Sequence, residues 1–391
     1  MSLNHEVVLL DGLRTPFGRF KGALSHLESR RLNATLIKAL AQRIPQISHC
    51  DGVILGQVLQ GGMGQNPARL AAAEAGLGLD VPALTLNNVC LAGMAAVADA
   101  RRRILLGEGE LYVVGGGDSM SRGRHAAVLR EGIKGVQAIP FIDTTLYDGL
   151  WCGIQDAGMG PISDELNEKL QISRDDQDAF ALQSHQRAAA AQEAGFFEAE
   201  MWLDDSVYEL SRDEGVRANS SLEALQKLKP AFTADGTLTA GNSSQMSDGA
   251  SIGVVASAEY AQRHQYQPLA HVIAAAQTAG PDTSLHLRPA DAISAVLKQS
   301  GLGIDDIDLF EINEAFASVV LASARKLSIP LDKINVNGGA IAIGHPLGGS
   351  GFRLVLTLAH ALKQQGKRYG IAAMCGGGGQ GFAVLLERRI S

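Results

Sequence analysis

Residues 84–118, LTLNNVCLAGMAAVADARRRILLGEGELYVVGGGD, combine a short apolar strand, a cysteine, a helix and a second strand that ends in glycines. The runs LTLNNV and LYVVGGGD are apolar and bounded by turn residues, as buried strands are. Between them, the segment after Cys90 has the composition of a helix. Strands that alternate with helices in this way predict an α/β fold with a mostly parallel sheet covered by helices.

The same order of elements recurs near the C-terminus. Residues 334–362, INVNGGAIAIGHPLGGSGFRLVLTLAHAL, place His345 before a helix, and residues 369–387, YGIAAMCGGGGQGFAVLLE, follow with a strand and a run of glycines. Sequence identity between the two stretches is low, but each has a reactive residue at a helix entrance and then a strand that ends in glycines. We therefore expect a duplicated α/β unit.

The segment between these two stretches has a different character. From residue 119 to residue 248 the chain is more polar and contains the helix-like run RDDQDAFALQSHQRAAAAQEAGF, which suits an insertion rather than more of the central sheet. We predict an N-terminal α/β half at residues 1–118 that is completed by about 249–268. An inserted loop or lid subdomain then covers 119–248, and a C-terminal α/β half covers 269–391.

Composition narrows the possible functions. The chain has 391 residues, a net charge of −7 and a pI near 5.8, which argue against nucleic-acid partners and anionic membrane surfaces. The 4 cysteines have no paired CxxC spacing, so neither a zinc site nor a disulfide framework is expected. The sequence shows no secretory signal and no apolar run long enough to span a bilayer, so we expect a cytoplasmic protein.

Cys90 is the first candidate for chemistry. A thiol at a helix N-terminus gains thiolate character from the helix dipole, and the free N–H groups there can also stabilise an oxyanion. Asn87 and Asn88 are candidates for capping that helix. The alternative is that Cys90 is a small buried apolar residue, as free cysteine often is.

His345 and Cys375 are the next candidates, because glycines surround both. An imidazole in the glycine-rich turn GHPLGGSG could move a proton, although a histidine before proline can also be an ordinary turn residue. The glycines after Cys375 expose backbone N–H groups that suit oxyanions or phosphates. A dinucleotide site is weakly supported, since no GxGxxG motif opens a helix here. Asn313 follows a strand and could hold a water or a carbonyl, or only cap the next helix.

Together these motifs resemble the thiolase family over nearly the whole chain. The resemblance is carried by RTPFGRFKGAL (14–24), VILGQVLQGGMGQNPAR (53–69), DEGVRANSSLEALQKLKPAF (213–232), TAGNSSQMSDGA (239–250), NEAFA (313–317), NVNGGAIAIGHPLGGSG (335–351) and CGGGGQG (375–381). It implies duplicated thiolase-type halves packed in α-β-α-β-α layers.

The resemblance also implies a role for each candidate residue. Cys90 would be the acylated nucleophile and His345 the base that activates it. Cys375 would exchange the α-carbon proton of the second substrate. Asn313 would hold a water that joins His345 in one oxyanion hole, and the N–H groups of Cys90 and Gly377 would form the other.

Coenzyme A (CoA) and acyl-CoA are the substrates that the resemblance implies, without a permanently bound cofactor or a metal. It places Ser244, Phe316 and Met159 along the pantetheine chain and Arg217 near the nucleotide end. For Arg217 a solvated surface charge is the alternative. The resemblance further implies a homodimer or a homotetramer.

Two departures from the family pattern leave the substrate open. Ala92 stands where the family usually has serine, and Gly158 stands where many members have histidine, within a long stretch at residues 146–160. The leading hypothesis is an acyl-CoA C-acyltransferase that makes acetoacetyl-CoA from two molecules of acetyl-CoA. The alternatives are a medium- or long-chain 3-ketoacyl-CoA thiolase of β-oxidation, a ketoacyl synthase (disfavoured by Cys375) and a non-catalytic acyl-CoA-binding protein.

Overall fold

A mixed β-sheet forms the centre of the molecule. The computed structural model describes residues 6–130, 132 and 138–389. The strands of the sheet are β1 (Val7–Arg14), β2 (Gly18–Arg19), β3 (Gly52–Gly56), β4 (Ala83–Leu86), β5 (Leu111–Ser119), β10 (Ser247–Ser257), β11 (Ala270–Ala279), β12 (Leu309–Ile312), β13 (Tyr369–Gly376) and β14 (Gln380–Glu387). They form a 10-stranded sheet in the order β12-β13-β14-β11-β1-β10-β5-β3-β4, with β2 paired to β10.

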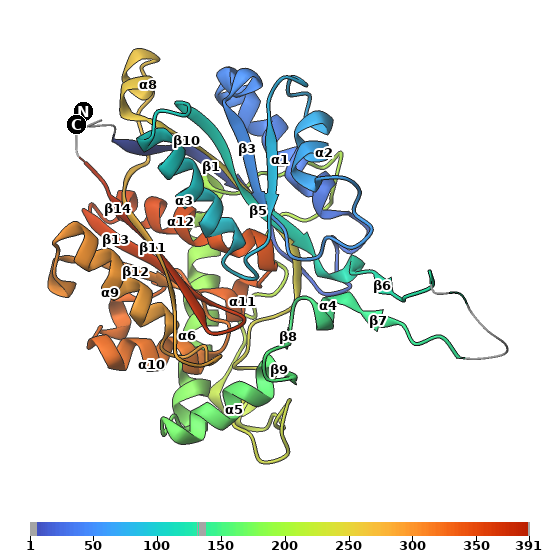
Figure 1. Cartoon of the computed structure of the whole chain (residues 1–391). Coiled ribbons are helices and arrows are strands. Elements are labelled where there is room, and N and C mark those ends of the chain that lie inside the picture. The colour runs from blue at the N-terminus through green and yellow to red at the C-terminus, as the bar shows by residue number, and fades with distance from the viewer. Residues whose placement is uncertain (1–5, 131, 133–137, 390–391) are drawn as a thin grey trace.

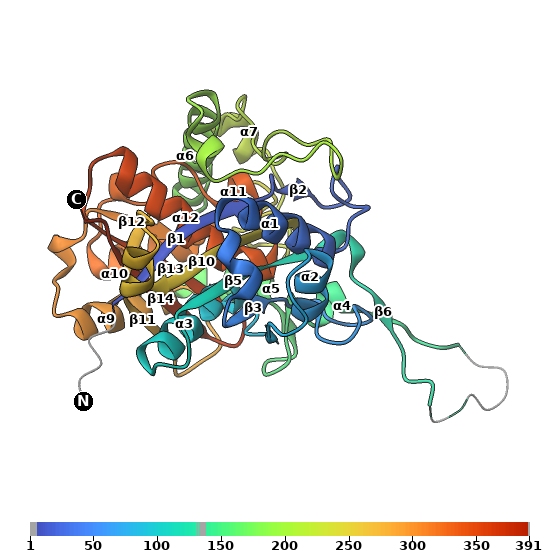
Figure 2. The same cartoon turned by 90° about the horizontal axis from the view of Figure 1, so that it is seen from above.

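Helices lie on both outer faces of this sheet and between its two halves. They are α1 (Ser29–Arg43), α2 (Pro67–Glu74), α3 (Ala92–Leu105), α8 (Ala258–Arg263), α9 (Arg288–Ser300), α10 (Ala317–Leu327), α11 (Ala340–Ile343) and α12 (Leu347–Gln364). Helices α1 and α2 pack on the N-terminal half of the sheet, and α9 packs on the C-terminal half with α10 beside it. Helices α3 and α12 pack against strands of both halves (Figures 1 and 2). The predicted α-β-α-β-α layering is confirmed.

The two halves repeat one topology. Strand β3 is parallel to β5, which is antiparallel to β10, and β10 is antiparallel to β1. In the C-terminal half β12, β13, β14 and β11 repeat this series with the same directions. The halves meet where β1 pairs with β11 through Val8 with His271 and Leu9 with Ala270. The predicted duplication is therefore present in the fold.

The two central helices approach each other closely at glycines. A Cβ atom on Gly93 of α3 would lie 2.6 Å from the carbonyl oxygen of Gly348, and one on Gly351 of α12 would lie 2.4 Å from the amide nitrogen of Met94. Neither space admits a side chain, so glycine is required at this crossing. Because the helices cross near their N-termini, the residues that precede them, Cys90 and His345, are brought to one region.

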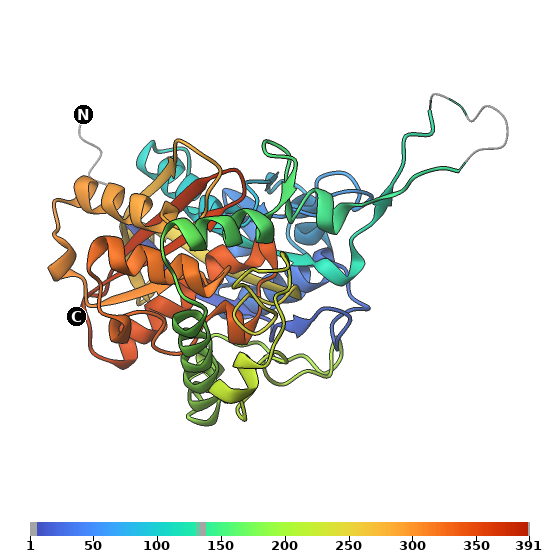
Figure 3. The same ribbon diagram turned by 90° about the horizontal axis from the view of Figure 1, so that it is seen from below.

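The segment between β5 and β10 forms separate short elements. They are β6 (His125–Ala126), β7 (Ile142–Asp143), α4 (Thr144–Tyr147), β8 (Trp151–Cys152), β9 (Ala157–Gly158), α5 (Met159–Lys169), α6 (Arg174–Glu193) and α7 (Leu222–Gln226). Helix α6 packs against α10 and α11 of the C-terminal half. The β6–β7 hairpin extends away from the body in every view (Figures 1–3). The exact division at residues 118 and 248 stays a prediction.

A buried ion cluster joins this inserted segment to β1. Arg14 Nε donates to Glu200 Oε1 at 2.6 Å, and its two terminal nitrogens donate to the Asp213 carboxylate at 2.6 and 2.9 Å. All three side chains are buried. A bidentate arginine–carboxylate pair fixes both position and orientation, so the insertion is held in a defined place beside the sheet. None of the helices in the described residues has the length and apolar character needed to cross a membrane.

Candidate active site

Cys90 lies in a tight turn between β4 and α3. The preceding residue, Val89, has a φ of 50°, which is rare for a β-branched residue, and its N–H donates to Asn87 Oδ1 at 2.9 Å. The prediction that Asn87 or Asn88 caps the helix is wrong. The N-cap residue of α3 is Leu91, which makes no side-chain cap bond, because the Asn87 oxygen is used inside the turn. Strained backbone of this kind gathers at functional sites.

The Cys90 sulfur receives hydrogen bonds but remains a thiol. The backbone N–H groups of Cys90 and Gly377 both reach the sulfur and lower its pKa, yet burial outweighs them and raises the pKa to about 12. The thiolate expected from the helix dipole is therefore wrong for the free protein. The physical reason is the apolar surroundings, which disfavour a charge. Cys90 packs against a cluster of buried apolar side chains, which are Val58, Leu59, Met120 and Leu347.

Cys375 lies at the end of β13, directly before a tight glycine turn. It pairs with Gly381 across the β13–β14 hairpin, and residues 377–379 form the turn between the strands. Gly378 and Gly379 have φ of 80° and 76°, which glycine adopts without strain. Burial, and then the nearby Cys90, raise the pKa of Cys375 well above its ordinary value. The two thiols are thus close together, and the turn carries the Gly377 N–H to the Cys90 sulfur.

His345 lies on the turn that leads into α12. Its Nδ1 is 2.5 Å from Ser350 Oγ, and its Nε2 is 3.4 Å from Asn313 Nδ2. Because the Ser350 hydroxyl donates to the Pro346 carbonyl at 2.8 Å, Nδ1 carries the proton and Nε2 is free to accept one. Burial, with the charge of Arg353, lowers the pKa of His345 to about 3, so the imidazole is neutral.

Asn313 is fully buried where β12 ends, and it faces the imidazole. Its Oδ1 has no partner among the described residues, which leaves an acceptor aimed into the site. Asn313 does not cap the next helix, since the N-cap residue of α10 is Phe316. Residues 242–247 connect this loop to the histidine turn. The Ser244 N–H donates to the Ala315 carbonyl and the His345 N–H donates to the Gln245 carbonyl, each at 3.0 Å.

Three of the predicted CoA-contacting residues lie near this group and one does not. Phe316 and Met159 pack in the same apolar cluster as Cys375, and the adjacent Ser244 is half-buried. Arg217 is exposed; its backbone N–H donates to His185 Nδ1 at 3.2 Å, and its carbonyl accepts from the Ser220 N–H at 3.1 Å. Geometry therefore separates Arg217 from the catalytic candidates.

Sequence reasoning missed two residues of this region. Ser350 holds His345 Nδ1, but its role depends on where α12 begins, which the run GHPLGGSG leaves undetermined. Phe232 packs edge-on against Phe316 with ring centroids 5.9 Å apart.

Because Phe232 and Phe316 are so distant in sequence, only the folded chain brings their rings together.

The two departures from the family pattern have distinct surroundings. Ala92 is fully buried, and a Cβ atom on Gly56 would lie 2.7 Å from its methyl group, so the site of the missing hydroxyl is tightly packed. Gly158 is the N-cap residue of α5. Within the long stretch at residues 146–160, Ile154 reaches the glycine turn, where its Cδ1 would lie 3.8 Å from a Cβ atom on Gly378.

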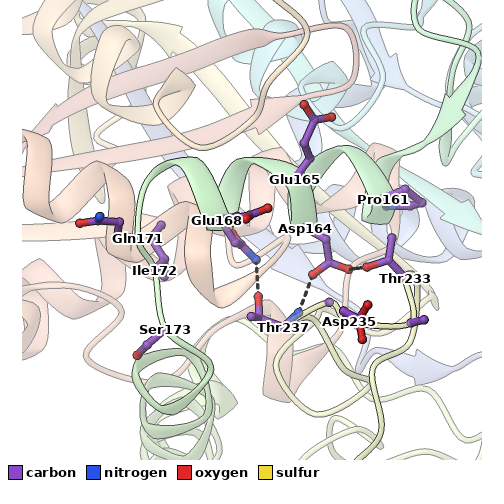
Figure 4. Close-up of a pocket in the computed structure, with 13 residues that line it drawn as sticks. Pro161, Asp164, Glu165, Glu168, Gln171, Ile172, Ser173, Thr233, Asp235 and Thr237 are labelled. Atoms are coloured by element: carbon purple, nitrogen blue, oxygen red, sulfur yellow. Dashed lines mark hydrogen bonds between the residues drawn. The ribbon is translucent and has the colours of Figure 1, made fainter.

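A large hollow elsewhere is not this site. It has a volume of about 1000 Å³ and lies between α5 and residues 233–237 (Figure 4). None of the catalytic candidates lines it, and its wall carries the acidic residues Asp164, Glu165, Glu168 and Asp235. Such a wall would repel the phosphates of CoA.

Comparison with known proteins agrees with this geometry. The "Thiolase, N-terminal domain" family matches residues 7–259, and the "Thiolase, C-terminal domain" family matches residues 266–388. A "Probable acetyl-CoA acetyltransferase" of Mycobacterium leprae is 44% identical, with 97% of this chain and 98% of the relative covered. The "Acetyl-CoA acetyltransferase, cytosolic" of Rattus norvegicus is 39% identical, with 98% of each chain covered.

Solved structures give the same result. The Bacillus anthracis acetyl-CoA acetyltransferase superposes with a TM-score of 0.93 at 35% identity, covering 98% of each chain. The human mitochondrial 3-ketoacyl-CoA thiolase superposes with a TM-score of 0.95 at 36% identity, covering 100% of each chain. With two matched domains, a duplicated fold and paired cysteines beside a histidine, this chain belongs to the thiolase family.

Proposed function

We propose that this protein transfers an acetyl group between two CoA thioesters, converting two molecules of acetyl-CoA to acetoacetyl-CoA and free CoA, and the reverse. The observation that carries the proposal is the set of groups around the Cys90 sulfur. The Cys90 thiol receives two backbone N–H groups and has a second thiol, Cys375, beside it. Acyl transfer to a cysteine needs such donors for the oxyanion, and carbon–carbon bond formation needs a second proton-transfer group.

Acylation begins from neutral groups. As the Cys90 sulfur attacks the acetyl carbonyl carbon, its proton moves to Nε2 of His345, because neither a free thiolate nor an imidazolium is stable in this buried site. The N–H groups of Cys90 and Gly377 stabilise the oxyanion of the tetrahedral adduct. The bond between the carbonyl carbon and the CoA sulfur then breaks, and the departing thiolate takes the proton of Cys375.

Condensation uses the thiolate that this step leaves on Cys375. Its raised pKa makes it a strong base, suited to removing a proton from the methyl group of the second acetyl-CoA. The protonated His345, with a water held by Asn313, donates to the enolate oxygen. The enolate carbon attacks the acetyl group on Cys90, acetoacetyl-CoA leaves, and Cys90 regains its proton from His345.

CoA contacts follow from the same placement. Phe316 and Met159 offer an apolar surface to the pantetheine chain next to Cys375, and Ser244 offers a polar group beside them. The exposed Arg217 would meet the nucleotide end, where a solvated cation can pair with phosphate. The reaction needs no resident cofactor, since the thioester supplies the reactive bond.

Intact-mass measurement tests the proposal. Incubation with acetyl-CoA should add one acetyl group at Cys90, and Cys90→Ala should add none. Cys375→Ser should still accept the acetyl group but lose condensation by at least about 100-fold, since general-base removal commonly costs this much. Absence of any adduct on the wild-type protein, or unchanged condensation in Cys375→Ser, would contradict the assignment of these roles.

A thiolysis panel of 3-ketoacyl-CoA substrates tests the acyl length. We expect acetoacetyl-CoA to be cleaved with the highest kcat/KM, because the residues around Cys90 form a tightly buried apolar wall. Preference for a medium or long chain would instead assign the protein the activity that the human relative's name states.

We further propose that the protein is cytoplasmic and forms a homodimer or homotetramer. The rat relative's name places that protein in the cytosol, and its similarity to this chain supports the same location. Light scattering of the purified protein measures the number of subunits, and a monomer would overturn this part of the proposal.

A further inference from the structure

The duplication relates the catalytic residues of one half to specific residues of the other. Cys90 lies two positions before α3, and His345 lies two positions before α12. Gly116 of β5 pairs with the last residue of β3, as Ala373 of β13 pairs with the last residue of β12. Two positions further along these strands are Asp118 and Cys375. Asp118 is therefore the N-terminal counterpart of Cys375.

Asp118 is fully buried and accepts hydrogen bonds from both halves of the molecule. Its carboxylate accepts from the Val58 N–H at 3.0 Å and from the Leu59 N–H at 3.0 Å, in the loop after β3. It also accepts from the Gly348 N–H at 2.7 Å, in the first turn of α12. A carboxylate at a helix N-terminus is favourably placed for both the free N–H groups and the dipole.

These three contacts join the two walls of the active site. Val58 and Leu59 pack against Cys90, and Gly348 lies three residues after His345. We propose that Asp118 is a positioning residue that fixes the histidine turn relative to the Cys90 wall and places its negative charge near the Cys90 thiol. This inference rests on the proposed function, because it assigns Asp118 to the Cys90–His345 proton transfer.

The charge of Asp118 supplies the second part of this role. The negative carboxylate raises the pKa of the Cys90 thiol, in the same direction as burial. Burial also raises the pKa of Asp118 itself to about 6, against its three N–H donors, so near neutral pH the carboxylate is charged.

Asp118→Asn separates these effects, because it removes the charge and some acceptor capacity at nearly constant size. At about pH 8, we expect iodoacetamide to alkylate Cys90 at least about threefold faster, because loss of the negative charge raises the thiolate fraction of Cys90. Acetyl transfer from acetyl-CoA to Cys90 should be at least about tenfold slower, because the histidine turn is no longer fixed. In steady-state turnover we expect kcat to fall while KM changes little.

Asp248→Asn is the matched control. Asp248 is also a fully buried carboxylate, but it accepts from residues 119–121 rather than from the loop after β3 or from α12. In Asp248→Asn the rates of alkylation and of acetylation of Cys90 should both stay within about twofold of wild type, a typical effect of a substitution away from the site. If Asp118→Asn does not fold, Asp118→Ser, which leaves room for a water, should show the same opposite changes.

Two results would overturn the inference: wild-type acetylation in the Asp118 variants, or equal losses in the Asp248 control. Slower alkylation in Asp118→Asn would also contradict the charge effect. The alkylation rates need no substrate, so they test Asp118 even if the wild-type protein is not acetylated. A wild-type protein that is not acetylated would count against the proposed function alone.

Discussion

At the residue scale, Cys90 and His345 form a pair that is neutral until substrate arrives. Burial raises the pKa of the Cys90 thiol to about 12 and lowers the pKa of the His345 imidazole to about 3. Transfer of the proton from sulfur to nitrogen therefore costs free energy in the empty site. Formation of the sulfur–carbon bond compensates for it, so reactivity is coupled to the presence of the thioester.

This pair makes alkylation of Cys90 depend steeply on pH. Only the thiolate reacts, and at a pH far below the pKa of a thiol its ionised fraction rises about tenfold per pH unit. Between about pH 6 and pH 9, the iodoacetamide rate at Cys90 should thus rise continuously, as read from the mass of the modified peptide. A plateau near pH 7 would instead indicate a stable thiolate–imidazolium pair.

At the element scale, helix α12 packs against strands of both halves of the sheet. Phe352 of α12 is fully buried, and its ring fills the space beside Gly253 of β10, where a Cβ atom would lie 2.0 Å from Cζ. The same ring lies 3.0 Å from the position of a Cβ atom on Gly12 of β1. The glycines on these strands therefore provide room for an aromatic side chain from the helix.

Phe352→Ala should destabilise the protein by about 3–5 kcal/mol, the usual cost of a cavity left by a buried aromatic ring. Urea unfolding monitored by circular dichroism measures this change. Phe20→Ala is the control, because Phe20 is 37% exposed and should cost less than about 1 kcal/mol. A loss in Phe352→Ala as small as the one expected for Phe20→Ala would show that the packing of this ring on the strands contributes little to stability.

At the scale of the whole molecule, the two halves depend on each other. Helix α12 packs against β5 and β10 of one half and β12 and β13 of the other, and α3 likewise contacts strands of both. Neither half can unfold without exposing the apolar surface that these helices bury. The duplicated units therefore behave as one cooperative structure.

We expect a single unfolding transition in urea. Both tryptophans, Trp151 and Trp202, lie in the inserted segment, and Trp202 packs against the core of the N-terminal half, so Trp fluorescence reports on these two regions. Thiol reactivity of the buried Cys375 reports on the C-terminal half. The two midpoints should coincide. Reaction of Cys375 at a urea concentration that leaves the fluorescence unchanged would mean that the halves unfold separately.

The alternation of strands and helices and the duplication were predictable from the amino-acid sequence, and so were the candidate residues Cys90, His345, Cys375 and Asn313. These features are local, since hydrophobic periodicity and glycine-rich turns depend on neighbouring residues. The placement of Cys90 and His345 at helix entrances was predictable for the same reason. Both helices begin two residues after them.

The protonation states and hydrogen-bond partners of these residues depend on the folded chain and could not be predicted from local sequence. The helix-dipole argument predicted a thiolate at Cys90, but burial by residues distant in sequence reversed the sign of its pKa shift. Ser350 and Asp118 could not be assigned either, because helix phase sets the first and strand register sets the second. Charge and hydrogen bonding depend on what surrounds a group in space, and that is known only once the chain is folded.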